Sequence, residues 1–130
     1  MKRVIMTDKA PKPVGPYSQA VSLEDLVFLS GQIGIDPKSG RLVEGGARAE
    51  AMRCMENIKG VLSAIDLEMG DIVKTTIFVT DISSFKEVNE AYASYFRADP
   101  PARSTVGVAS LPLGAKVEIE AIAHRAKPSP

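Results

Sequence analysis

The segment that most restricts the fold of this chain is DIVKTTIFVTDI, residues 71–82, in which β-branched residues predominate. Such a composition is typical of a β-strand. Successive side chains of a strand point to opposite faces of its sheet. The apolar side chains therefore divide between two faces, Val73, Ile77 and Val79 on one and Ile72 and Phe78 on the other. A strand of this kind is stable where both faces of its sheet are covered.

Amphipathic helices are predicted on both sides of this strand in the sequence. From Ala47 to Ile65 apolar residues recur at intervals of three or four, which is typical of a helix with one buried face. A second stripe follows in residues 83–96, formed by Phe85, Val88, Tyr92 and Tyr95, and ADPP then ends the helix. Two helices can cover only one face of a sheet, so we expect another subunit to cover the second face in a symmetric assembly.

Four further stretches predict strands. They are residues 18–23, 26–35, 103–109 and 116–125, and the first two are expected to pair as a hairpin. The order of elements is then strands, helix, strand, helix and two strands. This order predicts an α+β fold with a ferredoxin-like kernel, in which a single mixed sheet carries both helices on one face. At 130 residues, the chain fits one domain spanning residues 1–130.

The charge and composition of the chain argue against several classes of function. Sixteen basic and sixteen acidic residues give a net charge of zero, so the positive surface of a dedicated nucleic-acid-binding protein is not expected. No stretch approaches the roughly 20 apolar residues that span a bilayer, and the N-terminal residues lack the apolar core of a signal peptide. A single cysteine cannot form an internal disulfide, which favours a reducing cytoplasm. We therefore expect a cytoplasmic protein that binds neither nucleic acid nor membrane.

Most of the familiar catalytic groups are missing from the sequence. His124 is the only histidine, and no cysteine pair or metal-binding motif occurs, so a metal site is not expected. A nucleophilic triad would need that same histidine. Cys54 lies beside the apolar stripe of the first predicted helix, and we interpret it as a small core residue rather than a reactive thiol.

Charged residues in the two C-terminal strands are the candidates for function. In the last strand the odd-numbered residues from 117 to 123 form an apolar face, and Glu118 and Glu120 point to the opposite face. The fork of Arg103 matches a carboxylate through two hydrogen bonds, and burial would raise the pKa of Glu118 toward a value suited to deprotonating water. The alternative is an Arg103–Glu118 ion pair that merely satisfies a subunit interface. A tight hairpin around LPLG would place Arg103 nearer Ile122 than Glu118, so their meeting depends on a different strand order or on a neighbouring subunit.

Several motifs together resemble the RidA (YjgF) family of reactive-intermediate deaminases. They are VGPYSQAV, FLSGQIGIDPKSG, MENIKGVL, TTIFVTDISSF, VNEAY and, most specifically, PPARSTVGVASLPLGAKVEIEAIA, and they cover nearly the whole chain. The resemblance implies a homotrimer of a chorismate-mutase-like fold, with sheets inside, helices outside and a site in each cleft between subunits. It also implies a role in metabolite damage control: the hydrolysis of 2-aminoacrylate, 2-iminopropanoate and 2-iminobutanoate to 2-keto acids and ammonia, without a cofactor.

The same resemblance implies roles for individual residues. Arg103 would clamp the substrate carboxylate, and Glu118, the first glutamate of VEIE, would orient the attacking water. The backbone at Gly31 would lie close to the ligand. The other substrate-binding residues that the resemblance implies are Tyr17, Ser30, Asn89 and Thr105. Thr105 stands where many members carry a cysteine, and Gly34 stands where proline is common.

Other functions stay open from the sequence. A trimer of this kind could bind 2-keto acids or related metabolites without turning them over. Ribonuclease and chaperone-like activities are reported in the family, but the zero net charge and the aromatic content of 5% disfavour RNA binding here. The sequence does not select the preferred side chain of the imino acid.

Overall fold

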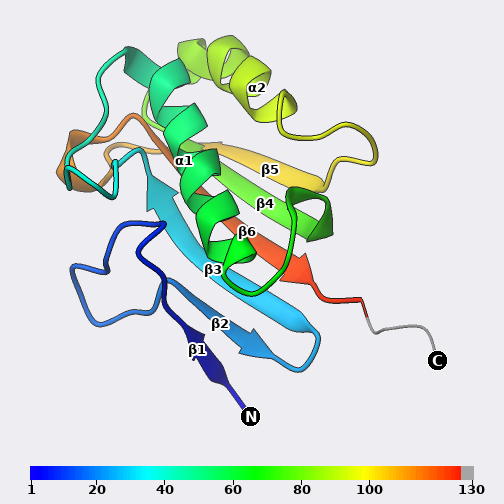
Figure 1. Ribbon diagram of the computed structural model, residues 1–130. Coiled ribbons are helices and arrows are strands. Elements are labelled where there is room, and N and C mark those ends of the chain that lie inside the picture. Colours follow the sequence, from blue (N-terminus) through cyan, green and yellow to red (C-terminus); the bar gives the residue numbers. More distant parts are fainter. Residues whose placement is uncertain (127–130) are drawn as a thin grey trace.

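The computed structural model describes residues 1–126, and residues 127–130, which the one-domain prediction included, lie outside the described residues. Six strands form one mixed sheet, and two helices pack on one of its faces (Figure 1). The strands are β1 (Arg3–Ile5), β2 (Ala20–Leu23), β3 (Leu26–Ile33), β4 (Ile72–Val79), β5 (Ala102–Gly107) and β6 (Val117–His124). The helices are α1 (Gly46–Ser63) and α2 (Phe85–Ala93), and short 3-10 helices form η1 (Met69–Asp71), η2 (Ile82–Ser84) and η3 (Pro112–Gly114).

The sheet has the strand order β1-β2-β3-β6-β4-β5, so that β1 and β5 are its edges. Neighbouring strands are antiparallel except β4 and β5, which are parallel because the chain crosses over through α2 between them. The α+β class, the single mixed sheet and the two helices on one face are confirmed. The ferredoxin-like kernel is wrong, because that motif runs β-α-β-β-α-β, whereas β3 to β6 and their helices run β-α-β-α-β-β.

Pairing between neighbouring strands settles two further expectations. The hairpin predicted near residues 18–35 is confirmed as β2 and β3, which pair antiparallel from Ala20 with Leu29 to Leu23 with Leu26. The last two strands do not pair with each other, because β4 lies between them. β1 is a strand that the sequence pattern does not predict, since only Ile5 of its three residues is buried.

The hydrophobic core lies between the helices and the sheet. The predicted stripe of α1 is fully buried at Ala51, Met55, Ile58 and Leu62. The sheet faces it with the buried side of β6, Val117, Ile119, Ala121 and Ala123. Each large aliphatic side chain buried in this way stabilises the fold by about 1.5–3 kcal/mol. Cys54 is fully buried in the same layer, which confirms its interpretation as a core residue.

The two faces of β4 differ from the prediction at one end of the strand. A bulge directly after Ile72 interrupts the register of β4 with β6. Ile72 is consequently buried on the same face as Ile77 and Val79. Val73, the extra residue, is 47% exposed. Phe78 points to the opposite face, as predicted, because a bulge reassigns only the residues on one side of it.

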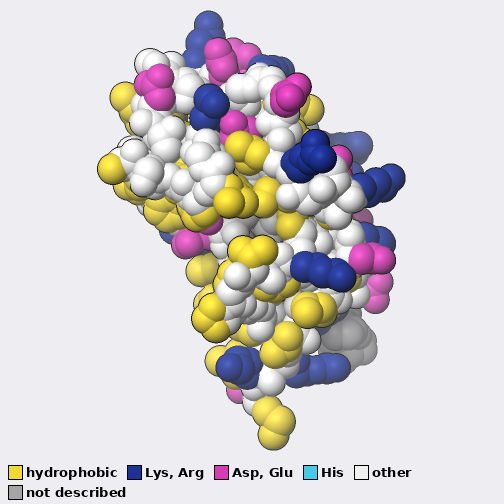
Figure 2. All heavy atoms as spheres, turned by 90° about the vertical axis from the view of Figure 1, so that its left-hand side faces the viewer, with side chains coloured by type: hydrophobic (Ala, Val, Ile, Leu, Met, Phe, Trp, Pro, Cys, Tyr) yellow, Lys and Arg dark blue, Asp and Glu magenta, His cyan; other side chains and the backbone are white. Residues whose placement is uncertain are grey.

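The sheet face away from α1 and α2, called the open face below, is covered by no helix among residues 1–126 (Figure 1). Its partly exposed hydrophobic side chains include Phe28, Phe78, Val106 and Ile122. In Figure 2, hydrophobic side chains gather toward the side of the molecule that carries this face. We predict that another subunit covers it, because a patch of this kind is otherwise exposed to water.

One buried amide holds the N-terminal loop in place. The Gln19 amide nitrogen donates to three loop carbonyl oxygens, those of Thr7, Ala10 and Pro11. Its Oε1 accepts from the backbone N–H of Thr7 at 2.7 Å. On the other side of the loop, a Cβ at Gly60 of α1 would lie 2.6 Å from a loop carbonyl oxygen, so only glycine permits this close approach. These contacts fix the segment that leads to Tyr17.

Candidate active site

Arg103 lies in the edge strand β5 and points toward α2. In the parallel pairing of β4 with β5 it stands opposite Thr75, whose side chain is buried on the helix face. Arg103 Nη1 donates to Asn89 Oδ1 at 2.6 Å. Thr105 shares this face, because alternate residues of a strand point the same way. The structure therefore brings together three of the predicted site residues, and all three are partly buried.

The guanidinium of Arg103 is held against α2 without a charged partner. It lies over the rings of Phe85 and Tyr92, at 5.5 Å and 5.1 Å from their centroids. Among residues 1–126, no carboxylate forms an ion pair with it. An arginine has five N–H donors in a planar fork, and one donor group is occupied by Asn89. The arrangement leaves N–H groups that can bind an anion.

Glu118 lies in β6 on the open face and lines a cavity of about 190 Å³. Gly31 of β3 and Tyr17 of the loop before β2 line the same cavity, so the structure brings these three predicted residues together as well. The other walls are largely apolar, with Pro11, Val14, Ile33, Ile35, Pro112 and Leu113 among them. A cavity of this size suits a small organic molecule, because drug-sized ligands occupy about 300–1,000 Å³.

Gly31 and Glu118 are in direct contact. The register of β3 with β6 shifts between Leu29 and Gln32, and Gly31 lies within this irregular segment. A Cβ at Gly31 would lie 2.6 Å from Glu118 Oε2 and 2.9 Å from its Cδ, so glycine is required for the carboxylate to keep its position. Bulged segments of this kind often re-aim side chains beside functional sites. Here the backbone of β3 lies against the carboxylate.

The environment of Glu118 favours its neutral form. Burial raises the pKa of the Glu118 carboxyl above its ordinary value, and the Glu120 carboxylate raises the pKa further. Both residues project from the open face of β6 because they are two positions apart in the strand. A carboxylate with a raised pKa is a better acceptor for a proton from water.

The two groups of residues lie on opposite faces of the same sheet. Arg103 shares the helix face with Thr75. Glu118 alternates along β6 with the fully buried Val117 and Ile119, and so it points to the open face. Side chains on opposite faces of one sheet cannot close around one small ligand. Within a single chain, Arg103 and Glu118 therefore form neither an ion pair nor a joint binding site.

Ser30 and Gly34 have local structural partners. Ser30 Oγ donates to the carbonyl oxygen of Ser18 at 2.6 Å, and Ser30 lines a shallow hollow that it shares with Tyr17. A Cβ at Gly34 would lie 2.9 Å from the Cα of Glu50, so the absence of a side chain allows α1 to pack closely against the end of β3. Ser30 is thus beside the cavity of Glu118 rather than among its lining residues.

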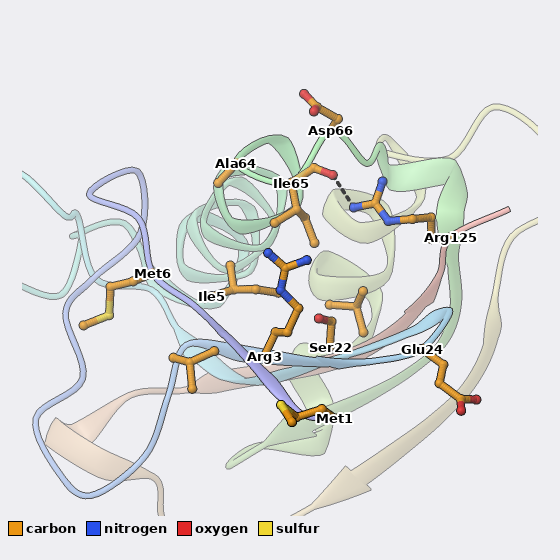
Figure 3. Close-up of a pocket in the computed structure, with 12 residues that line it drawn as sticks. Met1, Arg3, Ile5, Met6, Ser22, Glu24, Ala64, Ile65, Asp66 and Arg125 are labelled. Carbon is orange, nitrogen blue, oxygen red and sulfur yellow. Dashed lines mark hydrogen bonds between the residues drawn. The ribbon is translucent and has the colours of Figure 1, made fainter. Parts of the chain in front are cut away.

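A separate hollow of about 690 Å³ lies at the β1 edge of the sheet, between β1 and the end of α1 (Figure 3). Arg3 and Arg125 project into it. Arg125 donates a hydrogen bond to the carbonyl oxygen of Ile65, just after α1. Cationic side chains at this end of a helix satisfy its free carbonyl groups and interact favourably with its dipole. The hollow contains none of the predicted site residues, and Arg125 has a structural role there.

Two aromatic residues belong to the surroundings of Arg103 although no role in the site is predicted for them. The helical period places Phe85 and Tyr92 in the buried stripe of α2, and nothing in the sequence indicates that Arg103 lies against both rings. Residues 1–126 contain no group of three or more side chains suited to a metal ion. No helix in this part of the chain is both long and apolar enough to cross a membrane.

The fold and the two groups of polar residues define a small α+β protein with an arginine-centred cluster on one sheet face and a glutamate-lined cavity on the other. A family model described as Endoribonuclease L-PSP matches residues 7–125. The chain belongs to this family, which is the RidA family.

Individual relatives are similar over almost their whole length. A human protein named 2-iminobutanoate/2-iminopropanoate deaminase is 47% identical over 95% of this chain and 90% of its own. The crystal structure of RidA from a Psychrobacter species superimposes with a TM-score of 0.91 at 43% identity, covering 94% of this chain and 98% of the other. TdcF of E. coli, whose structure contains bound serine, gives a TM-score of 0.91 at 42% identity, with coverage of 95% and 99%.

Proposed function

We propose that this protein hydrolyses small 2-imino acids and their 2-enamine tautomers to 2-keto acids and ammonia. The substrates that we expect are 2-aminoacrylate, 2-iminopropanoate and 2-iminobutanoate. The name of the human relative supports this assignment. The observation that carries it is the combination of an arginine fork without an ionic partner and a glutamate of raised pKa beside a small cavity.

In the proposed reaction, the N–H groups of Arg103 bind the substrate carboxylate, and Asn89 orients the guanidinium. Ionised Glu118 accepts a proton as a water oxygen bonds to the imine carbon, and the C=N electron pair moves to nitrogen. Glu118 then returns that proton to the nitrogen. Glu118 next transfers the hydroxyl proton to the same nitrogen, so that the C–N bond breaks, the carbonyl forms and neutral ammonia leaves. The imine carbon is already electrophilic, so positioning of substrate and water is the main task of the protein.

The remaining predicted residues have supporting roles in this proposal. Gly31 leaves room for the carboxylate of Glu118 and brings the backbone of β3 close to the ligand. Tyr17 and Thr105 line the proposed site and Ser30 lies beside it, and their hydroxyl groups are available to the substrate or to water.

We place the complete site between neighbouring copies of the chain in a homotrimer, with the sheets inside. The position of Arg103 and Glu118 on opposite faces supports this arrangement, because only a second copy can bring the two groups to one ligand. The exposed hydrophobic side chains of the open face also support it. The oligomeric state can be measured by sedimentation, for which the proposal requires a trimer.

The activity is tested with imines generated continuously from amino acids by an amino-acid oxidase, with semicarbazide trapping the imine that remains. The protein should reduce the amount trapped in proportion to its concentration. Arg103→Ala and Glu118→Gln should each lose most of this effect. Arg48→Ala is the matched control, because Arg48 is an exposed arginine that pairs with Glu90 on the helix side. Unchanged imine decay with the wild-type protein, or full activity of Arg103→Ala, would refute the proposal.

Sharing of the site is tested by mixing the two inactive variants, Arg103→Ala and Glu118→Gln, under conditions that allow subunits to exchange. Random assortment in a trimer should restore about one quarter of the sites, because each site takes one residue from each of two neighbours. No recovery, with exchange demonstrated by mass spectrometry, would contradict a site shared between copies.

A metabolite-binding protein without catalysis is the alternative that the serine-bound relative supports. It predicts that 2-ketobutanoate binds while imine decay stays unchanged, and that Glu118→Gln leaves the affinity unaltered. The deaminase proposal predicts turnover and a strong effect of Glu118→Gln on rate.

A further inference from the structure

We propose that Phe85 and Tyr92 are positioning residues that hold the guanidinium of Arg103 in the orientation needed to bind the substrate carboxylate. This inference rests on the proposed function, in which Arg103 is the carboxylate clamp. The pair of rings is called the aromatic cradle below. Neither ring is expected to touch the substrate.

The geometry of the cradle is specific. The Arg103 Cζ atom lies 5.1 Å from the ring centroid of Tyr92 and 5.5 Å from that of Phe85. Both distances are within the range of about 6 Å at which a guanidinium is attracted to an aromatic face. Asn89 accepts from Nη1 at 2.6 Å, so the guanidinium is held by two rings and one hydrogen bond. Phe85, Asn89 and Tyr92 all project from α2, with a spacing of four and then three residues, and therefore form one continuous face of that helix.

Tyr92 is itself fixed by the sheet. Its hydroxyl forms a buried hydrogen bond of 2.7 Å with Thr75 Oγ1. Thr75 is the residue of β4 that stands opposite Arg103 of β5. The ring that supports the guanidinium is thus attached to the strand next to the one that carries the arginine. Tyr92 also packs against Phe96 in a tilted arrangement, with ring centroids 5.0 Å apart.

Position matters here because Arg103 lies on an edge strand. A long side chain at an edge can adopt many conformations, and binding a carboxylate through two hydrogen bonds selects very few of them. Aromatic faces attract the guanidinium without consuming its N–H donors, which a carboxylate partner would do. The cradle therefore restricts the arginine and leaves its donors available to an anionic ligand.

The test compares ring removal with ring retention. Phe85→Leu and Tyr92→Leu replace a ring by an aliphatic side chain, whereas Phe85→Tyr and Tyr92→Phe keep it. We expect the leucine variants to raise the dissociation constant of 2-ketobutanoate and the KM for the imine by about tenfold. Phe85→Tyr should stay within about twofold of the wild type. Tyr92→Phe, which keeps the ring but loses its hydrogen bond to Thr75, should have a smaller effect than Tyr92→Leu. Phe96→Leu is the matched control, because it removes a ring that packs on Tyr92 but is not part of the cradle.

A structural role alone predicts a different result. If the rings only stabilise α2, then Phe85→Leu, Tyr92→Leu and Phe96→Leu would lower the melting temperature to similar extents and leave the dissociation constant at the wild-type value. That outcome would overturn the inference while leaving the deaminase proposal intact. Thermal unfolding of every variant is therefore measured beside calorimetric binding.

A readout independent of ligand separates failure of the cradle from failure of the proposed function. Ring currents from two aromatic faces should shift the Arg103 side-chain proton resonances upfield in the free protein, with Arg103→Lys used for assignment. These resonances should move toward ordinary values in both leucine variants and remain shifted in Phe96→Leu. Unshifted wild-type resonances would refute the cradle. Shifted resonances in a protein that neither binds 2-ketobutanoate nor consumes imine would support the cradle and refute its role in carboxylate binding.

Discussion

Replacement of Gly31 by alanine should separate catalysis from stability. The added Cβ would lie 2.6 Å from Glu118 Oε2, whereas an ordinary contact begins at 3.4 Å, so the carboxylate has to move by 0.8 Å or more. The backbone of Gly31 does not have a positive φ, so alanine brings no backbone strain. The clash falls on the end of a flexible side chain, and we therefore expect the free energy of unfolding to change by less than about 1 kcal/mol.

The expected effect on the reaction is much larger. Displacement of a reacting group by about 1 Å can cost about a hundredfold in rate, so Gly31→Ala should lower kcat of imine hydrolysis by about 10- to 100-fold. The assay is the oxidase-coupled trapping of residual imine, together with urea unfolding of the same preparation. Gly70→Ala is the matched control, since a Cβ at Gly70 meets no atom within 4 Å. A Gly31→Ala variant with wild-type kcat would refute the reasoning that the position of the Glu118 carboxylate limits the rate.

Three further predictions follow from buried or interacting side chains. Glu120→Gln should shift the acid limb of the kcat/KM profile of imine hydrolysis to lower pH. The reason is that the Glu120 carboxylate raises the pKa of Glu118, and Glu118 must be ionised to act as a base. An acid limb that does not move would exclude Glu118 as that base. Glu50→Ala should reduce the free energy of unfolding by roughly 1–3 kcal/mol in urea titrations, because the buried Glu50 carboxylate accepts from the backbone N–H of Lys116 at 2.7 Å. Glu50→Gln should reduce the free energy of unfolding by less, because its side chain keeps an acceptor oxygen. Cys54 should react with a thiol reagent only after unfolding, since burial and the Glu50 carboxylate raise the pKa of its thiol; rapid modification of the folded protein would contradict this.

Regular elements are the part of the fold that the sequence predicts well. Apolar residues recur at intervals of three or four in α1 and at every second position in β6. Both patterns predict which side chains are buried, and both predictions are confirmed. The bulge after Ile72 escapes prediction because alternation assumes an uninterrupted strand. β1 escapes because a strand of three residues with one buried side chain has no detectable period. The ferredoxin-like kernel is wrong because the order of elements, which the sequence predicts and the structure confirms, differs from that of the motif.

The candidate site depends even more on strand order. The alternation in β6 predicts the sheet face of Glu118, but nothing in the sequence indicates which face Arg103 occupies. Insertion of β4 between β5 and β6, and the register of each pair, place them on opposite faces. Phe85 and Tyr92 illustrate the same limit, since a helical stripe predicts burial without identifying the arginine that they contact.

The position of Arg103 and Glu118 on opposite faces of the sheet has a consequence for the inheritance of duplicated genes. If neighbouring copies complete each site, an organism with two slightly different genes for this chain can lose the arginine from one and the glutamate from the other, and mixed assemblies would still contain complete sites. Each damaged gene would then be retained because the other is damaged. Duplicated genes for such a protein could in this way become mutually dependent without any gain of activity.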